Sequence, residues 1–247
     1  MAEKVKIKIG HETIIGVYSS GKSDLDACIV TCHGLLASKD SPKYIFLAEE
    51  MLKYGYSTLR FDFRGCGESS GSLVNSHISN RLSDLDAVVE YAKSELGFSG
   101  LGLFGSSLGG FVSYLKASSD PRISAMVTLS SPFSMRELFE TRNLINNSYE
   151  IDGVIFGNDF IKDVKDHGEL TSKVFDSIKS PTLIFHGSAD LLVPLEHAHK
   201  LFESLKTEKM LKIIGGGDHI FSNPIHLYQI IQGSSEWFRK YLPKPGK

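Results

Sequence analysis

Residues 101–111 read Leu-Gly-Leu-Phe-Gly-Ser-Ser-Leu-Gly-Gly-Phe and contain the pattern G-x-S-x-G from Gly105 to Gly109. An apolar run typical of a buried strand leads into this pattern, and a helical pattern follows it. A strand that turns sharply into a helix forces the central residue, Ser107, into a strained backbone conformation. Glycine suits the positions two residues to either side, because a side chain there would collide with neighbouring backbone. The stretch therefore predicts a turn that exposes the Ser107 hydroxyl.

Ser106 is the alternative nucleophile in the same turn, but the glycine spacing selects Ser107. A glycine-rich turn with an incidental serine is the other interpretation of the pattern. A serine hydroxyl is a poor nucleophile at neutral pH and needs an adjacent base. The interpretation of Ser107 as a nucleophile therefore requires a base and an acid elsewhere in the chain.

His219 is the candidate base among the nine histidines. It follows the last expected strand, so it should lie at the carboxyl edge of a parallel sheet, as Ser107 does. Histidine can take up and return a proton near neutral pH. Asp190 also follows a strand and is the candidate acid that orients the imidazole ring. Asp218 is the alternative acid, but a residue adjacent to His219 has little room to fold back onto the ring. The chain order Ser, Asp, His is typical of one family of serine hydrolase folds.

Backbone N–H groups are the expected stabilisers of a negatively charged tetrahedral intermediate. One donor should be the N–H of Leu108, directly after the candidate nucleophile. The second should come from the loop after the first buried strand, residues 33–36. Gly34 would let this loop turn so that the N–H of Leu35 faces the site, with Leu36 as the alternative. A plain turn after a strand is the competing interpretation.

Strands and helices are expected to alternate along most of the chain after an N-terminal hairpin. The expected strands are Val5–Ile9, Glu12–Tyr18, Ala27–Cys32, Ser57–Phe61, Leu101–Phe104, Ala125–Leu129, Thr182–Phe185 and Lys209–Ile214. The expected helices are Tyr44–Tyr54, Arg81–Leu96, Leu108–Ala117, Glu196–Leu205 and Pro224–Leu242, with Ser79 or Asn80 as the N-cap of the second. This order predicts the α/β class, with a mostly parallel eight-stranded sheet and helices on both faces.

Residues 132–180 interrupt this alternation and are rich in bulky apolar side chains. A segment this long between two core strands is too large for an ordinary loop and should carry structure of its own. We expect it to form a small inserted cap over the active site. The core of the fold should then comprise residues 1–131 and 181–247.

The composition excludes several classes of partner. The chain has 247 residues, 41% hydrophobic and 23% charged, and a formal net charge of −2, which gives no reason to expect nucleic acid as a partner. No stretch is apolar enough for a membrane span, and the N-terminal residues do not resemble a signal peptide. The three cysteines, Cys28, Cys32 and Cys66, are expected to be reduced thiols of a cytoplasmic protein. His197 and His199 have no acid or thiol cluster around them, so no metal is expected. A homodimer is compatible with the sequence.

Five segments together carry a family resemblance over nearly the whole length of the chain. They are His33-Gly34, Asp62–Ser69, Gly105–Gly109, His186–Pro194 and Gly217–His219. In these segments the chain resembles the α/β-hydrolases, and within them the group of bacterial cinnamoyl/feruloyl esterases and serine-aminopeptidase-like, or monoacylglycerol-lipase-like, proteins. In that family Arg64 and the two glycines near it would shape a turn beside the site. One position departs from the resemblance, since several cinnamoyl esterases have glutamine where this chain has Leu108.

The resemblance implies hydrolysis of a small carboxylic ester without a cofactor. The apolar side chains of the expected cap suggest a pocket for a short-to-medium or aromatic acyl group. Ser107 would form an acyl-enzyme, with His219 as general base and Asp190 as the acid that orients it. Thioesterase, peptidase and acyltransferase activities use the same residues and remain open, since a fold alone does not choose between them. A ligand-binding module that keeps the fold without turnover is the alternative from another class. Dehalogenase-like chemistry would require an aspartate in place of Ser107.

Overall fold

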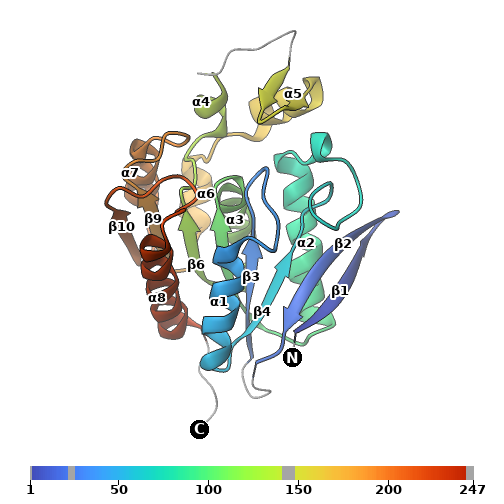
Figure 1. The fold of residues 1–247 in the computed structure, drawn as a ribbon, viewed down its shortest axis with the longest axis vertical. Helices are drawn as coiled ribbons and strands as arrows, with labels where there is room; N and C mark the ends of the chain where they lie inside the picture. The colour runs from blue at the N-terminus through green and yellow to red at the C-terminus, as the bar shows by residue number, and fades with distance from the viewer. Residues whose placement is uncertain (1, 22–25, 141–147, 243–247) are drawn as a thin grey trace.

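The sheet has eight strands in the order β1-β2-β4-β3-β5-β6-β9-β10 (Figure 1). In this computed structural model, residues 2–21, 26–140 and 148–242 are described. The strands are β1 (Ala2–Ile9), β2 (Glu12–Ser19), β3 (Ala27–Cys32), β4 (Ser57–Phe61), β5 (Gly100–Ser106), β6 (Ile123–Leu129), β9 (Thr182–Gly187) and β10 (Lys209–Ile214). β1, β2 and β4 pair antiparallel, and all neighbours from β4 to β10 pair parallel. The prediction of an α/β fold with a mostly parallel eight-stranded sheet is confirmed.

The order of the strands reverses between β3 and β5. After β3 the chain forms β4 on one side and then returns to form β5 on the other side of β3. In parallel sheets the loops that leave two such strands diverge, and a crevice opens between them at the carboxyl edge. The loop 33–36 follows β3, and Ser107 follows β5, so both lie at this crevice.

Helices cover both faces of the sheet, and each face has its own apolar core. α1 (Pro42–Lys53) and α8 (Pro224–Tyr241) lie side by side on one face, as Figure 1 shows. α2 (Ile78–Ser94), α3 (Leu108–Ser119) and α7 (Leu195–Ser204) contribute to the core on the other face. The side chains of β3 alternate between the two cores: Ala27 and Ile29 face α1 and α8, whereas Cys28 and Val30 face α2 and α3. This alternation explains why β3 is apolar on both sides.

Two helices begin earlier than the sequence predicts. α1 begins at Pro42 because proline is favoured in the first turn, where its missing N–H has no intrahelical partner. α2 begins at Ile78 with His77 as its N-cap, so the prediction of Ser79 or Asn80 as N-cap is wrong. The hydroxyl and N–H of Ser79 instead bind the carboxylate of Asp163. A contact with a distant acid therefore replaces the local cap.

The inserted segment contains short elements. They are α4 (Met135–Glu140), the hairpin of β7 (Tyr149–Ile151) and β8 (Val154–Phe156), α5 (Asn158–His167) and α6 (Ser172–Ser177). Figure 1 shows α4, α5 and the hairpin beyond the carboxyl edge of the sheet, whereas α6 lies beside α3. Phe139 packs against Phe160 at 5.4 Å between ring centroids, and Phe133 stacks on Phe175 at 5.6 Å. The bulky side chains of this segment thus form an apolar cluster, although residues 141–147 lie outside the described part of the expected cap.

No helix in the described ranges is long and apolar enough to span a membrane. The three cysteines are buried free thiols.

Candidate functional site

Ser107 lies in a strained turn between β5 and α3. Its φ of 53° and ψ of −125° are unusual for a residue with a side chain, and its N–H donates to the Leu129 carbonyl at 2.9 Å. Glycine is required at Gly109, because a Cβ there would come within 2.1 Å of the Cys32 carbonyl oxygen. A Cβ at Gly105 would likewise approach the Ser113 hydroxyl to 2.6 Å. The two glycines therefore let α3 pack against the end of β3 and leave the Ser107 hydroxyl projecting from the turn.

The imidazole of His219 lies between the Ser107 hydroxyl and the Asp190 carboxylate. Its Nε2 is 3.1 Å from Ser107 Oγ, and its Nδ1 is 2.8 Å from Asp190 Oδ2. An ionised carboxylate can only accept hydrogen bonds, so Nδ1 carries the proton that Asp190 accepts. Nε2 is then free of hydrogen and accepts from the Ser107 hydroxyl. The structure thus brings together three residues that are widely separated in the sequence, with the geometry that general-base activation of a serine requires.

The Asp190 carboxylate is buried and remains in its charged form. Its Oδ1 accepts the backbone N–H groups of Leu192 and Val193, each at 2.9 Å. Burial opposes ionisation, but the hydrogen bond and charge of His219, together with the N–H of Val193, outweigh it. These groups hold the pKa of Asp190 below its ordinary value. Both oxygens of Asp190 are therefore engaged, and the carboxylate is fixed in the position that orients the ring.

The two alternatives from the sequence have other contacts. The Ser106 hydroxyl accepts from the Lys43 ammonium at 3.2 Å, and burial lowers the pKa of this lysine to about 8. Asp218 accepts the N–H of Ser222 at 2.8 Å and closes a turn in the loop after His219. Neither Ser106 nor Asp218 contacts the imidazole within the described residues.

A second histidine, His186, lies behind Asp190. It is fully buried, and its Nε2 lies 2.9 Å from the Val193 carbonyl and 3.5 Å from Asp190 Oδ2. Burial lowers the pKa of His186, which favours the neutral ring. Its hydrogen bond to Val193 ties the end of β9 to the loop that carries Asp190. His186 therefore lies against the acid and contacts the same oxygen, Asp190 Oδ2, as His219 Nδ1 does.

The loop 33–36 approaches Ser107 closely. A Cβ on Gly34 would lie 3.4 Å from the Cβ of Ser107, an ordinary van der Waals distance, so the loop runs directly beside Ser107. Leu35 is half-buried and follows Gly34 directly, whereas Leu36 is more exposed. Leu108 is buried at the first position of α3, where a helix leaves its N–H groups without intrahelical partners. The candidate donors of Leu35 and Leu108 thus come from the two loops that meet at the crevice.

A buried ion-pair network lies at Lys39, shortly after this loop, and the sequence did not predict it. Asp62 accepts the N–H of Lys39 at 2.7 Å and its ammonium at 2.9 Å, and both side chains are almost fully buried. Glu68 binds the same ammonium at 2.7 Å. Gly67 has no room for a Cβ, which would come within 2.2 Å of the Asp62 carboxylate. Arg64 lies apart from this network and pairs with Asp84 and Glu12.

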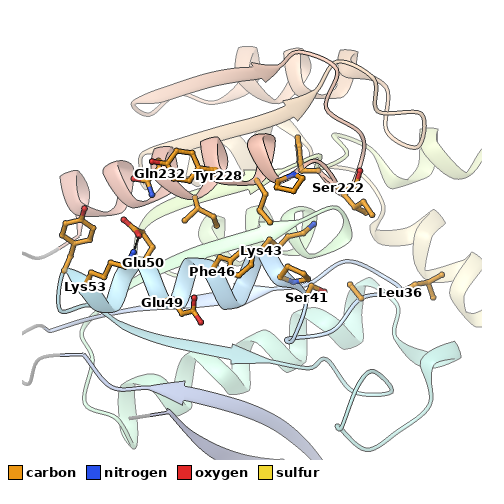
Figure 2. Close-up of a pocket in the computed structure, with 18 residues that line it drawn as sticks. Leu36, Ser41, Lys43, Phe46, Glu49, Glu50, Lys53, Ser222, Tyr228 and Gln232 are labelled. Carbon is orange, nitrogen blue, oxygen red and sulfur yellow. Dashed lines mark hydrogen bonds and ion pairs between the residues drawn. The ribbon is translucent and has the colours of Figure 1, made fainter.

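A cavity lies between α1 and α8, and Ser107 is not among the residues that line it. Its volume is about 1160 Å³, and α1 and α8 form its walls. Figure 2 shows Lys43 and Phe46 of α1 across from Tyr228 and Gln232 of α8. One end is formed by Leu36, which follows the loop 33–35, and by residues 220–222, which follow His219. None of the described residues of 132–180 lines this cavity, so its apolar walls come from the core and not from the expected cap.

His33 should make the stability of the fold sensitive to mild acid. Its ring is buried, and its Nε2 accepts the N–H of Phe63 at 3.0 Å. Burial, assisted by the charges of Arg81 and Lys39, lowers the pKa of His33 from its usual 6.5 to about 3. The unfolded chain therefore binds a proton below pH 6.5 that the folded chain does not bind. The stability that the neutral ring contributes above pH 6.5 is lost as the pH falls towards 3, at about 1.4 kcal/mol per pH unit.

Urea unfolding of the wild type and of His33→Gln, compared between neutral pH and pH 5, measures this effect. We expect the stability advantage of the wild type to shrink by about 2 kcal/mol over that interval. Equal losses in the two proteins would show that His33 is not the group responsible.

In the described ranges, no group of three or more histidine, cysteine, aspartate or glutamate side chains is arranged to hold a metal ion.

Comparisons with known proteins give the fold. Residues 28–146 match the family model described as alpha/beta hydrolase fold. The uncharacterized protein YfhR of Escherichia coli K12 is 26% identical over 207 residues, which cover 82% of this chain and 66% of YfhR. Palmitoyl-protein thioesterase ABHD10 of Bos taurus is 24% identical over 182 residues, which cover 67% of this chain and 58% of that protein. The chain thus spans about two thirds or less of the length of these relatives.

Among solved structures, Est1E of Butyrivibrio proteoclasticus with bound ferulic acid has a TM-score of 0.86. It is 22% identical, and the match covers 96% of this chain and 98% of Est1E. The mostly parallel eight-stranded sheet, the match to the family model and the similarity to Est1E point to one fold. The chain has the α/β-hydrolase fold.

Proposed function

We propose that the protein is a serine hydrolase that cleaves carboxylic esters, with Ser107 as nucleophile. The observation that carries this proposal is the continuous contact from Ser107 Oγ through His219 to Asp190, with distances of 3.1 Å and 2.8 Å. This contact lies at the crevice where the sheet order reverses, which is where open α/β sheets bind ligands. His219 acts as general base, and Asp190 holds the tautomer and stabilises the imidazolium.

The proposed reaction proceeds in two steps through an acyl-enzyme. His219 takes the proton of Ser107 as its oxygen attacks the ester carbonyl, and the carbonyl oxygen becomes negatively charged. This intermediate collapses, the bond to the alcohol oxygen breaks, and the alcohol leaves with the proton from His219. Water then attacks the acyl group, gives a proton to His219, and the carboxylic acid is released as the proton returns to Ser107.

The backbone N–H groups of Leu35 and Leu108 are the proposed donors to the negative oxygen. Leu35 follows Gly34 in the chain, and Leu108 follows Ser107. Gly34 lies against Ser107, so the two N–H groups come from neighbouring parts of the site. Donors fixed in position before the reaction stabilise the developing charge without reorganisation and contribute several kcal/mol to catalysis.

The substrate class is proposed as small esters with a short-to-medium or aromatic acyl group. The α1–α8 cavity has apolar walls and ends beside the loops of Leu35 and His219, so it can hold an apolar part of an ester. Ferulic acid, an aromatic acid, is the ligand of Est1E, which shares the fold. Thioester hydrolysis is a second candidate, because the relative from Bos taurus is a palmitoyl-protein thioesterase. Butyryl and feruloyl esters compared with the matching thioesters at equal concentration distinguish the two.

The segment 132–180 is proposed to act as a cap over the site. Its α4, α5 and β7–β8 hairpin lie beyond the edge of the sheet that carries Ser107 (Figure 1). The contact of Ser79 with Asp163 ties α5 to the start of α2 and so supports a fixed position of this segment.

Labelling with an alkyl fluorophosphonate tests the identity of the nucleophile. We expect one covalent adduct per chain, located on Ser107 by peptide fragmentation, since this reagent reacts with a serine that has an activating base. His219→Gln should slow the labelling strongly because it removes that base. An adduct on Ser106, or no adduct in the folded wild type, would contradict the proposal and would favour a binding module without turnover.

A further inference from the structure

Arg81 of α2 is fully buried beneath the loop 33–36 and donates to its carbonyl groups. One terminal nitrogen, Nη1, donates to the carbonyls of His33 and Gly34 at 2.9 Å and 3.2 Å, and the other, Nη2, donates to that of Leu35 at 3.0 Å. Its Nε donates to the carbonyl and the hydroxyl of Ser76 at 3.1 Å and 3.0 Å. The side chain is 0% exposed. A single guanidinium thus binds three successive carbonyls of the loop that passes Ser107.

No carboxylate among the described residues is in direct contact with this guanidinium. Asp84, one turn further along α2, is engaged by the side chain and N–H of Arg64. The remaining neighbours of Arg81 are the Cys66 thiol at 3.6 Å and the face of the Phe63 ring at 4.5 Å. Asp84 stabilises the charge of Arg81 from a distance, but a buried charge also needs direct hydrogen-bond partners. The loop carbonyls are therefore the groups that Arg81 is placed to bind.

The orientation of these carbonyls fixes the direction of the neighbouring N–H groups. No peptide bond in the described residues is cis, so the C=O and N–H of each planar unit point in opposite directions. The Gly34 carbonyl shares its peptide unit with the N–H of Leu35, and the Leu35 carbonyl shares its unit with the N–H of Leu36. Because Arg81 holds both carbonyls on one side of the loop, both N–H groups point away from it.

We propose that Arg81 is a positioning residue for the oxyanion site, holding and polarising the peptide units that present the N–H groups of Leu35 and Leu36 towards Ser107. A cation at the carbonyl end of a peptide unit draws electron density away from its N–H and makes that N–H a stronger donor. This inference rests on the proposed serine hydrolase function. Arg81 touches no substrate and acts through the backbone of the loop.

Arg81→Met, which keeps the volume and removes every donor, tests this inference in p-nitrophenyl butyrate hydrolysis. Because loss of one oxyanion donor costs about 10²- to 10³-fold in kcat, a misplaced donor should lower kcat by about 10- to 100-fold with little change in KM. The inhibition constant of an alkyl trifluoromethyl ketone, which forms a tetrahedral adduct on serine, should rise by the same factor as kcat falls. A purely structural role would not link these two quantities.

Arg60→Met is the matched control. Arg60 is another buried arginine, and it donates to the carbonyl of Lys39 at 2.6 Å, in the same connection between β3 and α1 but outside the proposed donor units. The Arg60→Met variant should have a lower melting temperature and a kcat within about threefold of the wild type. Equal losses of kcat in the two variants, or an unchanged kcat and ketone affinity in folded Arg81→Met, would overturn the inference.

Two further readouts keep the result decisive. If Arg81→Met does not fold, Arg81→Lys retains the charge but cannot reach three carbonyls, and it should still lose about tenfold in kcat. If the wild type neither hydrolyses esters nor binds the ketone, the proposed function fails by itself. A crystal structure of a folded Arg81 variant then tests the positioning role separately. Gly34 and Leu35 carbonyls that keep their present orientation in this variant would overturn the inference.

Discussion

Ser107→Ala is expected to lower kcat for p-nitrophenyl butyrate hydrolysis by about 10⁶-fold, to the residual rate that binding and the oxyanion site alone provide. The variant removes the oxygen that we propose as the nucleophile and leaves the imidazole of His219 in place. We expect the stability of the fold to change little, because replacing serine by alanine creates no large cavity at this half-buried position. Circular dichroism and the melting temperature establish that the variant is folded.

Ser106→Ala is the control for this experiment. The Ser106 hydroxyl contacts Lys43 and lies in the same turn. Its removal tests whether loss of either serine of the turn lowers kcat equally. We expect its kcat to stay within about tenfold of the wild type. Wild-type activity in Ser107→Ala, or its loss only in Ser106→Ala, would defeat the assignment of the nucleophile.

Asp190→Asn is expected to lower kcat by about 10⁴-fold at neutral pH. The amide retains the size of the carboxylate but loses the charge that stabilises the imidazolium. Its NH₂ group can also donate to Nδ1 of His219, which would place the ring proton on Nε2. A protonated Nε2 cannot accept the hydrogen bond from the Ser107 hydroxyl. Steady-state kinetics with the same ester measure the loss.

Asp218→Asn provides the matched comparison, since Asp218 is adjacent to His219 in sequence and binds Ser222 instead of the ring. We expect less than tenfold loss of kcat in this variant. The opposite pattern, with activity lost in Asp218→Asn and kept in Asp190→Asn, would show that the acid is misassigned.

The sequence predicts the sheet well because its strands carry a local signal. β3 is apolar at successive positions since both of its faces are buried, and this pattern needs no tertiary information. The turn at Ser107 is also predictable, since glycine at two fixed positions follows from the close contact of α3 with β3. The spatial order of strands then places Asp190 and His219 at the same edge, because parallel strands share their carboxyl ends.

The supports of the site could not be predicted in the same way. Arg81 and Lys39 bind backbone or acids that are far away in sequence, so no periodicity or motif marks their partners. Arg81 also falls at a position where the helix pattern alone predicts an ordinary charged residue of α2. The predicted start of α2 is wrong for a related reason. Ser79 binds Asp163 of the inserted segment instead of capping the helix. Long-range contacts of polar side chains are decided only in the folded chain.

The most direct test of the account is detection of the acyl-enzyme itself. Rapid mixing of the protein with p-nitrophenyl butyrate, followed by an acid quench and mass spectrometry of the peptides, should reveal one butyryl group bound to Ser107. The same experiment should show a burst of p-nitrophenol that does not exceed one equivalent of enzyme. Steady hydrolysis with no acyl group on Ser107, and with no burst in the wild type when deacylation is slowed at low pH, would contradict the assignment of Ser107 as the nucleophile.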